Sequence, residues 1–216
     1  SKEYPIHFPK PGWSEQEPAD WYRQAVAGMK ELLEGSDKTQ VAGISFGGQM
    51  HGLVVLDEAD EVIRPAILWN DGRTVKETEY LNNEIGKQKL SEYTGNIAFA
   101  GFTAPKLLWM YENERAQFDR IKKIMLPKDY LAYRLTGTHC TDYSDVSGML
   151  LLDVQHKCWS KEMLEICHIT EEQLPVLYES SACVGILKKE LAQELGLPEE
   201  VKVMAGAGDN AAAAIG

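Results

Sequence analysis

The sequence predicts an α/β fold, and three patterns indicate it. Short apolar segments of strand length alternate with longer segments in which apolar residues recur at helical spacing. Glycine or proline stands at most of the boundaries between them. The chain has 216 residues, of which 44% are apolar, and this is enough to build a substantial core. We therefore expect one large or two small domains in which strands and helices alternate.

Residues 1–70 are expected to contain one helix among short strands. Ser14 and Glu17 have the spacing of a capping box, and Pro18 suits a first helical turn. The helix that follows is expected to end at Gly35, because glycine readily adopts the left-handed conformation that terminates helices. Apolar runs predict strands at residues 4–8, 41–46, 53–56 and 62–69.

The remainder of the chain is expected to be mostly helical, with strands between the helices. The predicted helices span residues 74–84, 103–113, 127–135, 161–167, 171–174 and 188–195, and Gly137 and Gly196 end two of them. The predicted strands span residues 121–126, 147–154, 184–187 and 201–205. The last strand leads into a glycine turn and one turn of helix at residues 209–216. Because a single helical turn is unstable alone, we expect a truncated chain in preference to a frayed tail.

Composition and residue spacing bear on the partners, the location and the metal binding that can be expected. With 33 acidic and 22 basic residues the formal charge is −11, which disfavours nucleic acid or an anionic membrane as the main partner. Four widely spaced cysteines form no C-x-x-C pair, so a reducing, cytoplasmic location is expected. The first residues lack the apolar segment of a signal peptide. The five histidines show no H-x-x-x-H spacing, so no metal site is predicted.

The glycine turn before residue 211 admits three interpretations. Gly206, Gly208 and Ala211 fit the dinucleotide pattern G-x-G-x-x-A and would suggest an oxidoreductase. However, Asp209 lies in that turn, where its carboxylate would repel a pyrophosphate. Asp209 suits a helix N-cap, and it also suits a general base that accepts a proton from a substrate hydroxyl.

Two further segments, each after a predicted strand, carry ligand-binding compositions. Gln49 and His51 lie among glycines at residues 47–52, where the backbone can approach a ligand and both side chains can bind hydroxyls. The alternative is a glycine-rich turn with an exposed histidine. Trp69 and Asp71 belong to a Trp-Asn-Asp-Gly-Arg segment with a composition common in sugar sites. The alternative there is a helix start capped by Asp71.

Taken together, six ordered segments resemble the FGGY family of carbohydrate kinases, over nearly the whole chain. The segments are residues 48–52, 64–73, 101–109, 126–131, 141–148 and 206–211. Residues 101–113 are similar to the family signature, including its Lys106 and Trp109. Within the family, the Gln-Met-His-Gly element at residues 49–52 separates kinases for D-xylulose from those for glycerol, ribulose and gluconate.

The resemblance implies a ribonuclease H-like, actin-like ATPase fold, with this chain as the first, N-terminal domain of a two-domain sugar kinase. It implies transfer of the γ-phosphoryl group of ATP, with Mg²⁺, to O5 of D-xylulose. By motif position it assigns the catalytic base to Asp209 and sugar binding to Met50 and His51. The further candidates for sugar contact are Gln49, Asn210, Trp69 and Asp71.

Two parts of the family pattern are missing from residues 1–216. The opening strand pair with D-x-G-T, whose aspartate serves the metal, is not found, and neither is the second, nucleotide-binding domain. We therefore expect an FGGY N-terminal domain at residues 1–216 that is truncated at both ends. Most contacts to ATP and Mg²⁺ are then expected outside this chain, which alone should lack kinase activity. A non-catalytic sugar-binding module stays an alternative, and a homodimer is left open.

Overall fold

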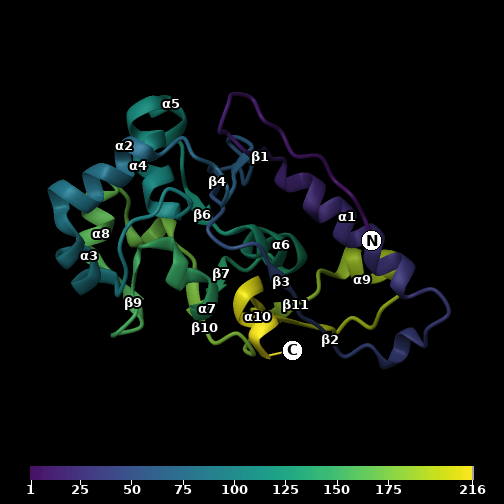
Figure 1. The fold of residues 1–216 in the computed structure, drawn as a ribbon. Coiled ribbons are helices and arrows are strands. Elements are labelled where there is room, and N and C mark those ends of the chain that lie inside the picture. The colour runs from purple at the N-terminus through teal and green to yellow at the C-terminus, as the bar shows by residue number, and fades with distance from the viewer. Residues whose placement is uncertain (216) are drawn as a thin grey trace.

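Short strands and helices alternate along residues 1–215, the part of the chain that the computed structural model describes (Figure 1). The α-helices are α1 (Pro18–Leu32), α2 (Val75–Glu79), α3 (Lys87–Thr94), α4 (Thr103–Asn113), α5 (Arg115–Phe118), α6 (Pro127–Thr136), α7 (Tyr143–Val146), α8 (Lys161–Ile166), α9 (Lys189–Leu195) and α10 (Asp209–Ile215). Short 3₁₀-helices span Lys38–Gln40, Ser147–Met149 and Glu171–Gln173, and a π-helical stretch spans Tyr80–Gly86. The predicted α/β class is confirmed.

The strands are two to four residues long. They are β1 (Glu15–Gln16), β2 (Gly43–Ile44), β3 (Gly47–Gly48), β4 (Val54–Leu56), β5 (Ala66–Ile67), β6 (Lys123–Met125), β7 (Cys140–Asp142), β8 (Leu152–Asp153), β9 (Cys158–Trp159), β10 (Val176–Tyr178), β11 (Cys183–Ile186), β12 (Lys202–Met204) and β13 (Ala207–Gly208). The largest sheet has the order β11-β12-β2, with β12 parallel to β2. The other described sheets are the pairs β1-β5, β4-β6, β7-β10, β8-β9 and β3-β13.

Residues 43–48 and 202–208 are distant in sequence but pair with each other through two successive pairs of parallel strands. The parallel pair β2 and β12 is followed in both stretches by a second parallel pair, β3 and β13. In that second pair Gly47 lies opposite Ala207, and Gly48 lies opposite Gly208. Because both strands run in the same direction, the loops that follow them begin at the same place. This arrangement positions the candidate site.

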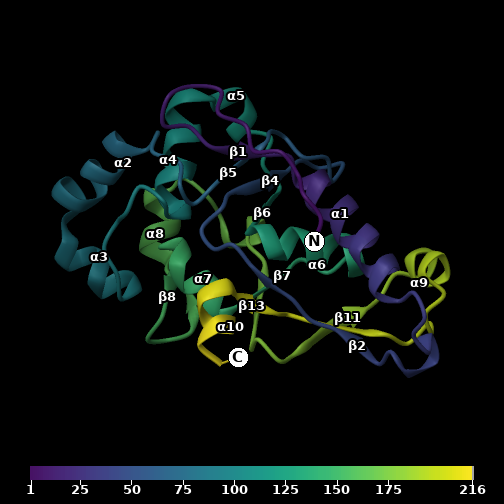
Figure 2. The same cartoon turned by 45° about the vertical axis from the view of Figure 1, so that its right-hand side comes forward.

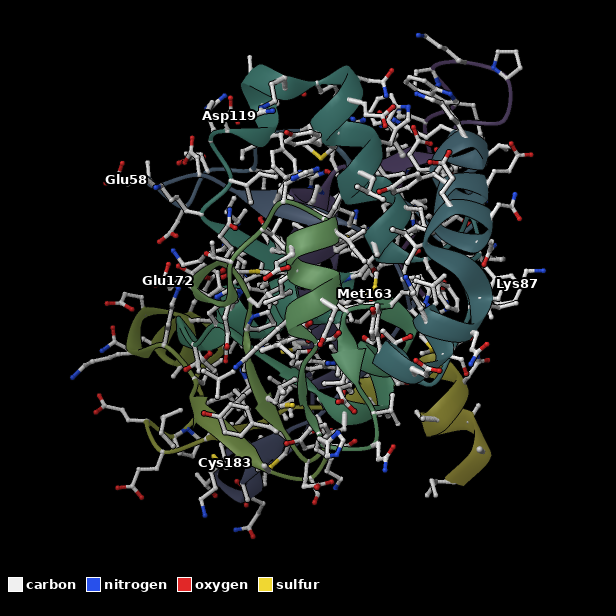
Figure 3. The ribbon with its side chains drawn as sticks, turned by 90° about the vertical axis from the view of Figure 1, so that its left-hand side faces the viewer. Glu58, Lys87, Asp119, Met163, Glu172 and Cys183 are labelled. Atoms are coloured by element: carbon white, nitrogen blue, oxygen red, sulfur yellow. The ribbon has the colours of Figure 1, made fainter. Side chains whose placement is uncertain are left out.

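Helices flank the strands on two sides. Figures 1 and 2 show α2, α3, α4 and α8 on one side, α1 and α9 on the other, and α6, α7 and α10 between them. The largest buried apolar cluster lies on the first side and includes Leu107 of α4 and Met163 of α8. In Figure 3 the buried Met163 lies in the interior, whereas the exposed Glu58 and Asp119 lie at the rim.

Most helix limits that depend on local signals were predicted well, but α1 ends at Leu32 and not at the predicted Gly35. Helix α4 spans the predicted residues 103–113. Helix α6 begins at Pro127, and Gly137 ends it with a left-handed φ of 85°. Gly196 ends α9 in the same conformation. These predictions are confirmed, because proline and glycine act on the backbone of their own turn.

The predicted N-terminal elements are wrong in two respects. Residues 4–8 form no strand and contribute only a bridge between His7 and Glu15, and Pro5 lacks the N–H that a strand ladder requires. Ser14 does not cap α1, whose N-cap is Glu17 without a side-chain hydrogen bond. The reason is that Glu15 and Gln16 pair with β5 as strand β1, so the helix begins only at Pro18, four residues after Ser14.

Two later elements also differ from the prediction. The helix predicted at 74–84 continues through the π-helical stretch into α3 and ends at Thr94. The strand predicted at 147–154 is a 3₁₀ turn followed by β8, with Leu150 in the left-handed region at φ 62°. Residues 148–152 of this run are buried, and a continuous apolar run does not by itself distinguish a strand from a buried turn.

Candidate functional site

The loops after β3 and β13 bring together four of the residues that the sequence analysis singled out. Met50 and His51 follow β3, and Asp209 and Asn210 follow β13. The Asn210 Nδ2 atom lies 3.9 Å from the Met50 sulfur. Gly208 leaves room for the Met50 side chain, because a Cβ at residue 208 would lie 3.0 Å from Met50 Cγ. Figure 2 shows the start of α10 beside α7, where these loops meet.

His51 is held in an uncommon backbone conformation. Its φ is 66°, and the Gly52 N–H donates to the Met50 carbonyl at 2.8 Å, so that His51 is the central residue of a γ-turn. Its ring stacks on Phe102, with centroids 4.6 Å apart and an interplanar angle of 28°. Gly148 fits closely against the ring, because a Cβ there would lie 2.3 Å from His51 Cε1. The imidazole is therefore fixed on several sides.

The hydrogen bond of His51 decides what its free nitrogen can do. Nδ1 lies 2.9 Å from the Gly148 carbonyl oxygen, which can only accept, so Nδ1 carries the proton. Burial lowers the pKa of His51, and the charge of Lys106 acts in the same direction, against the Gly148 hydrogen bond and Asp209. The ring is consequently neutral at pH 7, and Nε2 is a hydrogen-bond acceptor.

Asp209 is exposed at the first residue of α10. Its Oδ1 accepts from the Asn210 N–H at 2.8 Å, and a negative charge is favourable at a helix N-terminus. The preceding turn requires glycine at residue 206, where φ is 74° and a Cβ would lie 2.3 Å from the Phe46 carbonyl oxygen. The turn thus presents a carboxylate beside His51 and Asn210.

A buried charge cluster lies behind the Asp209 turn. Lys128 Nζ lies 2.6 Å from Asp129, 2.9 Å from Asp142 and 3.9 Å from Asp145. Burial opposes the charge of Lys128, but the three carboxylates raise its pKa above the ordinary value. Ser144 connects the cluster to the turn, because its hydroxyl donates to Asp142 and accepts from the Gly208 N–H at 3.2 Å.

The structure does not bring the remaining candidates into the same cluster. Gln49 turns away and donates to Gln16 Oε1 at 3.0 Å. Asp71 is buried, and its two oxygens accept from the Ser14 N–H and from three N–H groups of Arg73. Trp69 is 56% exposed and lies against Gly101, next to Phe102. Sugar contact by Gln49, Trp69 or Asp71 stays a prediction.

Sequence reasoning missed the groups that hold His51 in place. Phe102, Gly148 and Lys106 all lie in the recognised segments, but nothing in their spacing indicates contact with residue 51. Among residues 1–215 no group of three His, Cys, Asp or Glu side chains is arranged to hold a metal ion. Over the same residues, no helix combines the length and the low charge that a bilayer span would need.

Comparison with known proteins identifies the family. The sequence model of the FGGY family of carbohydrate kinases, N-terminal domain, matches residues 1–216. The xylulose kinase of Lactococcus lactis subsp. lactis is 49% identical over 222 residues, covering 100% of this chain and 43% of that protein. The crystal structure of a xyloylose kinase from Brucella ovis has a TM-score of 0.91 at 44% identity, covering 97% of this chain and 43% of that one.

A second solved structure shows how widely the fold is shared. The gluconate kinase from Lactobacillus acidophilus has a TM-score of 0.91 at 28% identity, covering 96% of this chain and 42% of that one. The chain thus spans less than half the length of the proteins that it matches. Its mixed α/β fold is that of these kinases and is consistent with an actin-like ATPase N-terminal domain. From the match over its full length, we conclude that the chain belongs to the FGGY family of carbohydrate kinases.

Proposed function

We propose that this chain is the sugar-binding, N-terminal domain of an ATP-dependent D-xylulose kinase, with Asp209 as the general base. One observation carries the proposal. The β3–β13 pair sets the exposed carboxylate of Asp209 beside the neutral imidazole of His51 and the amide of Asn210. A carboxylate, an acceptor and an amide in one open cluster suit a polyhydroxylated substrate.

Each side chain has a distinct task in this proposal. Asp209 accepts the proton of the hydroxyl that becomes phosphorylated, which increases the nucleophilicity of its oxygen. His51 accepts a hydrogen bond from a second hydroxyl through Nε2, because Nδ1 is committed to Gly148. Asn210 can both donate and accept, and Met50 supplies an apolar wall. The residues therefore act by orienting the sugar, and phosphoryl transfer depends largely on such positioning.

The proposal also includes ATP and Mg²⁺. ATP supplies the transferred phosphoryl group in this family, and we propose Mg²⁺ as its accompanying ion. Residues 1–215 offer no group of three metal-ligating side chains, so the steps above concern the sugar alone. A cytoplasmic location is supported by four cysteines that are all free.

The test is a substrate comparison on the complete gene product. We expect ATP-dependent phosphorylation of D-xylulose, with kcat/KM well above the values for glycerol and gluconate. Comparable kcat/KM for D-xylulose and glycerol would contradict the assignment of the sugar. Binding of D-xylulose without turnover would instead indicate a non-catalytic sugar-binding module.

A further inference from the structure

Lys106 has a buried amine whose hydrogen bonds to the described part of the chain go only to main-chain carbonyls. It lies on α4, and no part of it is exposed. Its Nζ donates to the His51 carbonyl oxygen at 2.8 Å and also to the Gly101 carbonyl oxygen. Within residues 1–215 no carboxylate pairs with it directly. Burying an ammonium group away from a counter-ion is costly, so its contacts require an explanation.

The His51 carbonyl, which accepts from Lys106, belongs to the residue with the strained backbone in the site. His51 has a φ of 66° in a γ-turn, a conformation that non-glycine residues avoid. Such a conformation persists only where surrounding groups over-determine it. Thr103, also on α4 and fully buried, donates its hydroxyl to the same carbonyl at 3.1 Å. Two donors from one rigid helix therefore hold the turn from below, while Gly148 and Phe102 hold the ring.

We infer that Lys106 is a positioning residue for the sugar site: together with Thr103 it locks the His51 turn and aims Nε2 at the substrate. The inference rests on the proposed function for the identity of the sugar. The hydrogen bonds that fix the His51 turn do not depend on which sugar binds. Lys106 touches no substrate atom and acts through His51.

The other charges near Lys106 are consistent with this role. Burial lowers the pKa of Lys106 to about 7, with Asp71 opposing the shift and Arg73 adding to it. The charged and the neutral amine both carry enough hydrogens to donate to two carbonyls, so the lock holds in either state. Asp71 and Arg73 are paired with each other at 2.7 Å, and they leave the Lys106 amine to the carbonyls.

The experiment is a double-mutant cycle between Lys106 and His51 in the complete gene product. Lys106→Met keeps the length and apolar stem of the side chain and removes the donor. We expect KM for D-xylulose to rise about tenfold, as for a lost hydrogen-bonding arrangement of about 1.4 kcal/mol, with a smaller change in kcat. Adding Lys106→Met to His51→Ala should raise KM no further. Additive effects would overturn the inference, because Lys106 would then act independently of His51.

A milder variant and a control separate positioning from loss of fold. Thr103→Val removes only the second donor and should give a smaller rise in KM, again absent in the His51→Ala background. Leu90→Ala on α3 removes a fully buried core side chain and should lower Tm without changing KM. If Lys106→Met does not fold, the Thr103→Val cycle decides the question. Equal KM changes in Leu90→Ala and Thr103→Val would overturn the inference.

A spectroscopic measurement keeps this inference separate from the proposed function. Imidazole ¹⁵N shifts of His51 should show one fixed Nδ1–H tautomer in the wild-type protein, and averaged or exchanging signals in Thr103→Val or Lys106→Met. Unchanged signals in both variants would overturn the lock. If the wild-type protein does not phosphorylate D-xylulose, the proposed function fails, and the ¹⁵N measurement alone tests the lock.

Discussion

The loops at residues 49–52 and 69–73 both carry polar side chains suited to a sugar, but they differ in which polar atoms already have partners. In the first, His51 keeps one ring nitrogen free, and the exposed Asp209 and Asn210 lie close to this loop. In the second, Asp71 accepts four hydrogen bonds, and Arg73 has a fully buried side chain that stacks 3.8 Å over Trp13. The first loop has polar atoms available to a ligand. The second uses the Asp71 carboxylate and the Arg73 guanidinium to join the N-terminal segment to the rest of the chain.

The difference shows what composition leaves out. Aromatic, amide, carboxylate and basic groups suit a sugar site and equally suit a closed ion-pair network. What separates the two is whether each donor and acceptor already has a partner in the folded chain. In the loop at residues 69–73 those partners are Ser14 and Glu15, which lie 57 and 58 positions away from Asp71 and Arg73.

The largest expected effect comes from Asp209→Asn, beside the loop at residues 49–52. Asparagine keeps the size and hydrogen bonding of the side chain but cannot take a proton from the sugar. We expect kcat to fall by about 10²–10⁴-fold, with Tm and D-xylulose binding retained. Turnover, melting temperature and sugar binding should be measured on one preparation. Near-normal turnover would make Asp209 a helix-capping residue.

An aspartate-to-asparagine change in the loop at residues 69–73 should lower stability and leave sugar binding unchanged. Asp71→Asn removes one of the two carboxylates that pair with the buried Arg73, the other being Glu15. We expect the free energy of unfolding to fall by about 3 kcal/mol, as when one partner of a buried pair is removed. KM of the folded protein should stay unchanged. A raised KM at unchanged stability, read from urea titrations and kinetics, would return Asp71 to the sugar site.

A smaller effect is expected for His51→Ala. The substitution removes one neutral hydrogen bond to the sugar, worth about 0.5–1.5 kcal/mol, so KM should rise about two- to twelvefold. The change in kcat should be smaller, because such a bond contributes mainly uniform binding. Initial-rate kinetics at saturating ATP would check this. A large fall in kcat at constant KM would place His51 in the chemical step.

The smallest effect is a pH dependence of sugar binding. Because burial lowers the pKa of His51 from 6.5, the ring is neutral above that pH and gains its second proton only below it. KM should therefore be flat from about pH 6.5 to 8 and rise at lower pH, as Nε2 ceases to accept. In His51→Ala this acid limb should be absent. A KM that already changes between pH 7 and 8 in the wild-type protein alone would show that His51 is not neutral there.

The sequence predicted local features well and long-range ones poorly. Helix α4 and the glycine stops at residues 137 and 196 were predicted to within a residue, because their signals lie within one turn of helix. The strand predicted at 41–46 is only Gly43–Ile44 in the fold, since strand limits depend on a distant partner. Met50 and Asp209 were grouped by resemblance. The carbonyl contacts of Lys106 depend on packing that spacing does not encode.

The β3–β13 pair also has a consequence for how the site comes into being. Met50 and Asn210 are 160 positions apart, and the β3–β13 pair brings their loops together. During synthesis the ribosome must therefore produce almost all of these residues before the two halves of the site can meet. Closing so long a loop is slow, so the site should be among the last features to form on refolding. Recovery of sugar affinity would then trail recovery of helical circular dichroism, and would report when folding is complete.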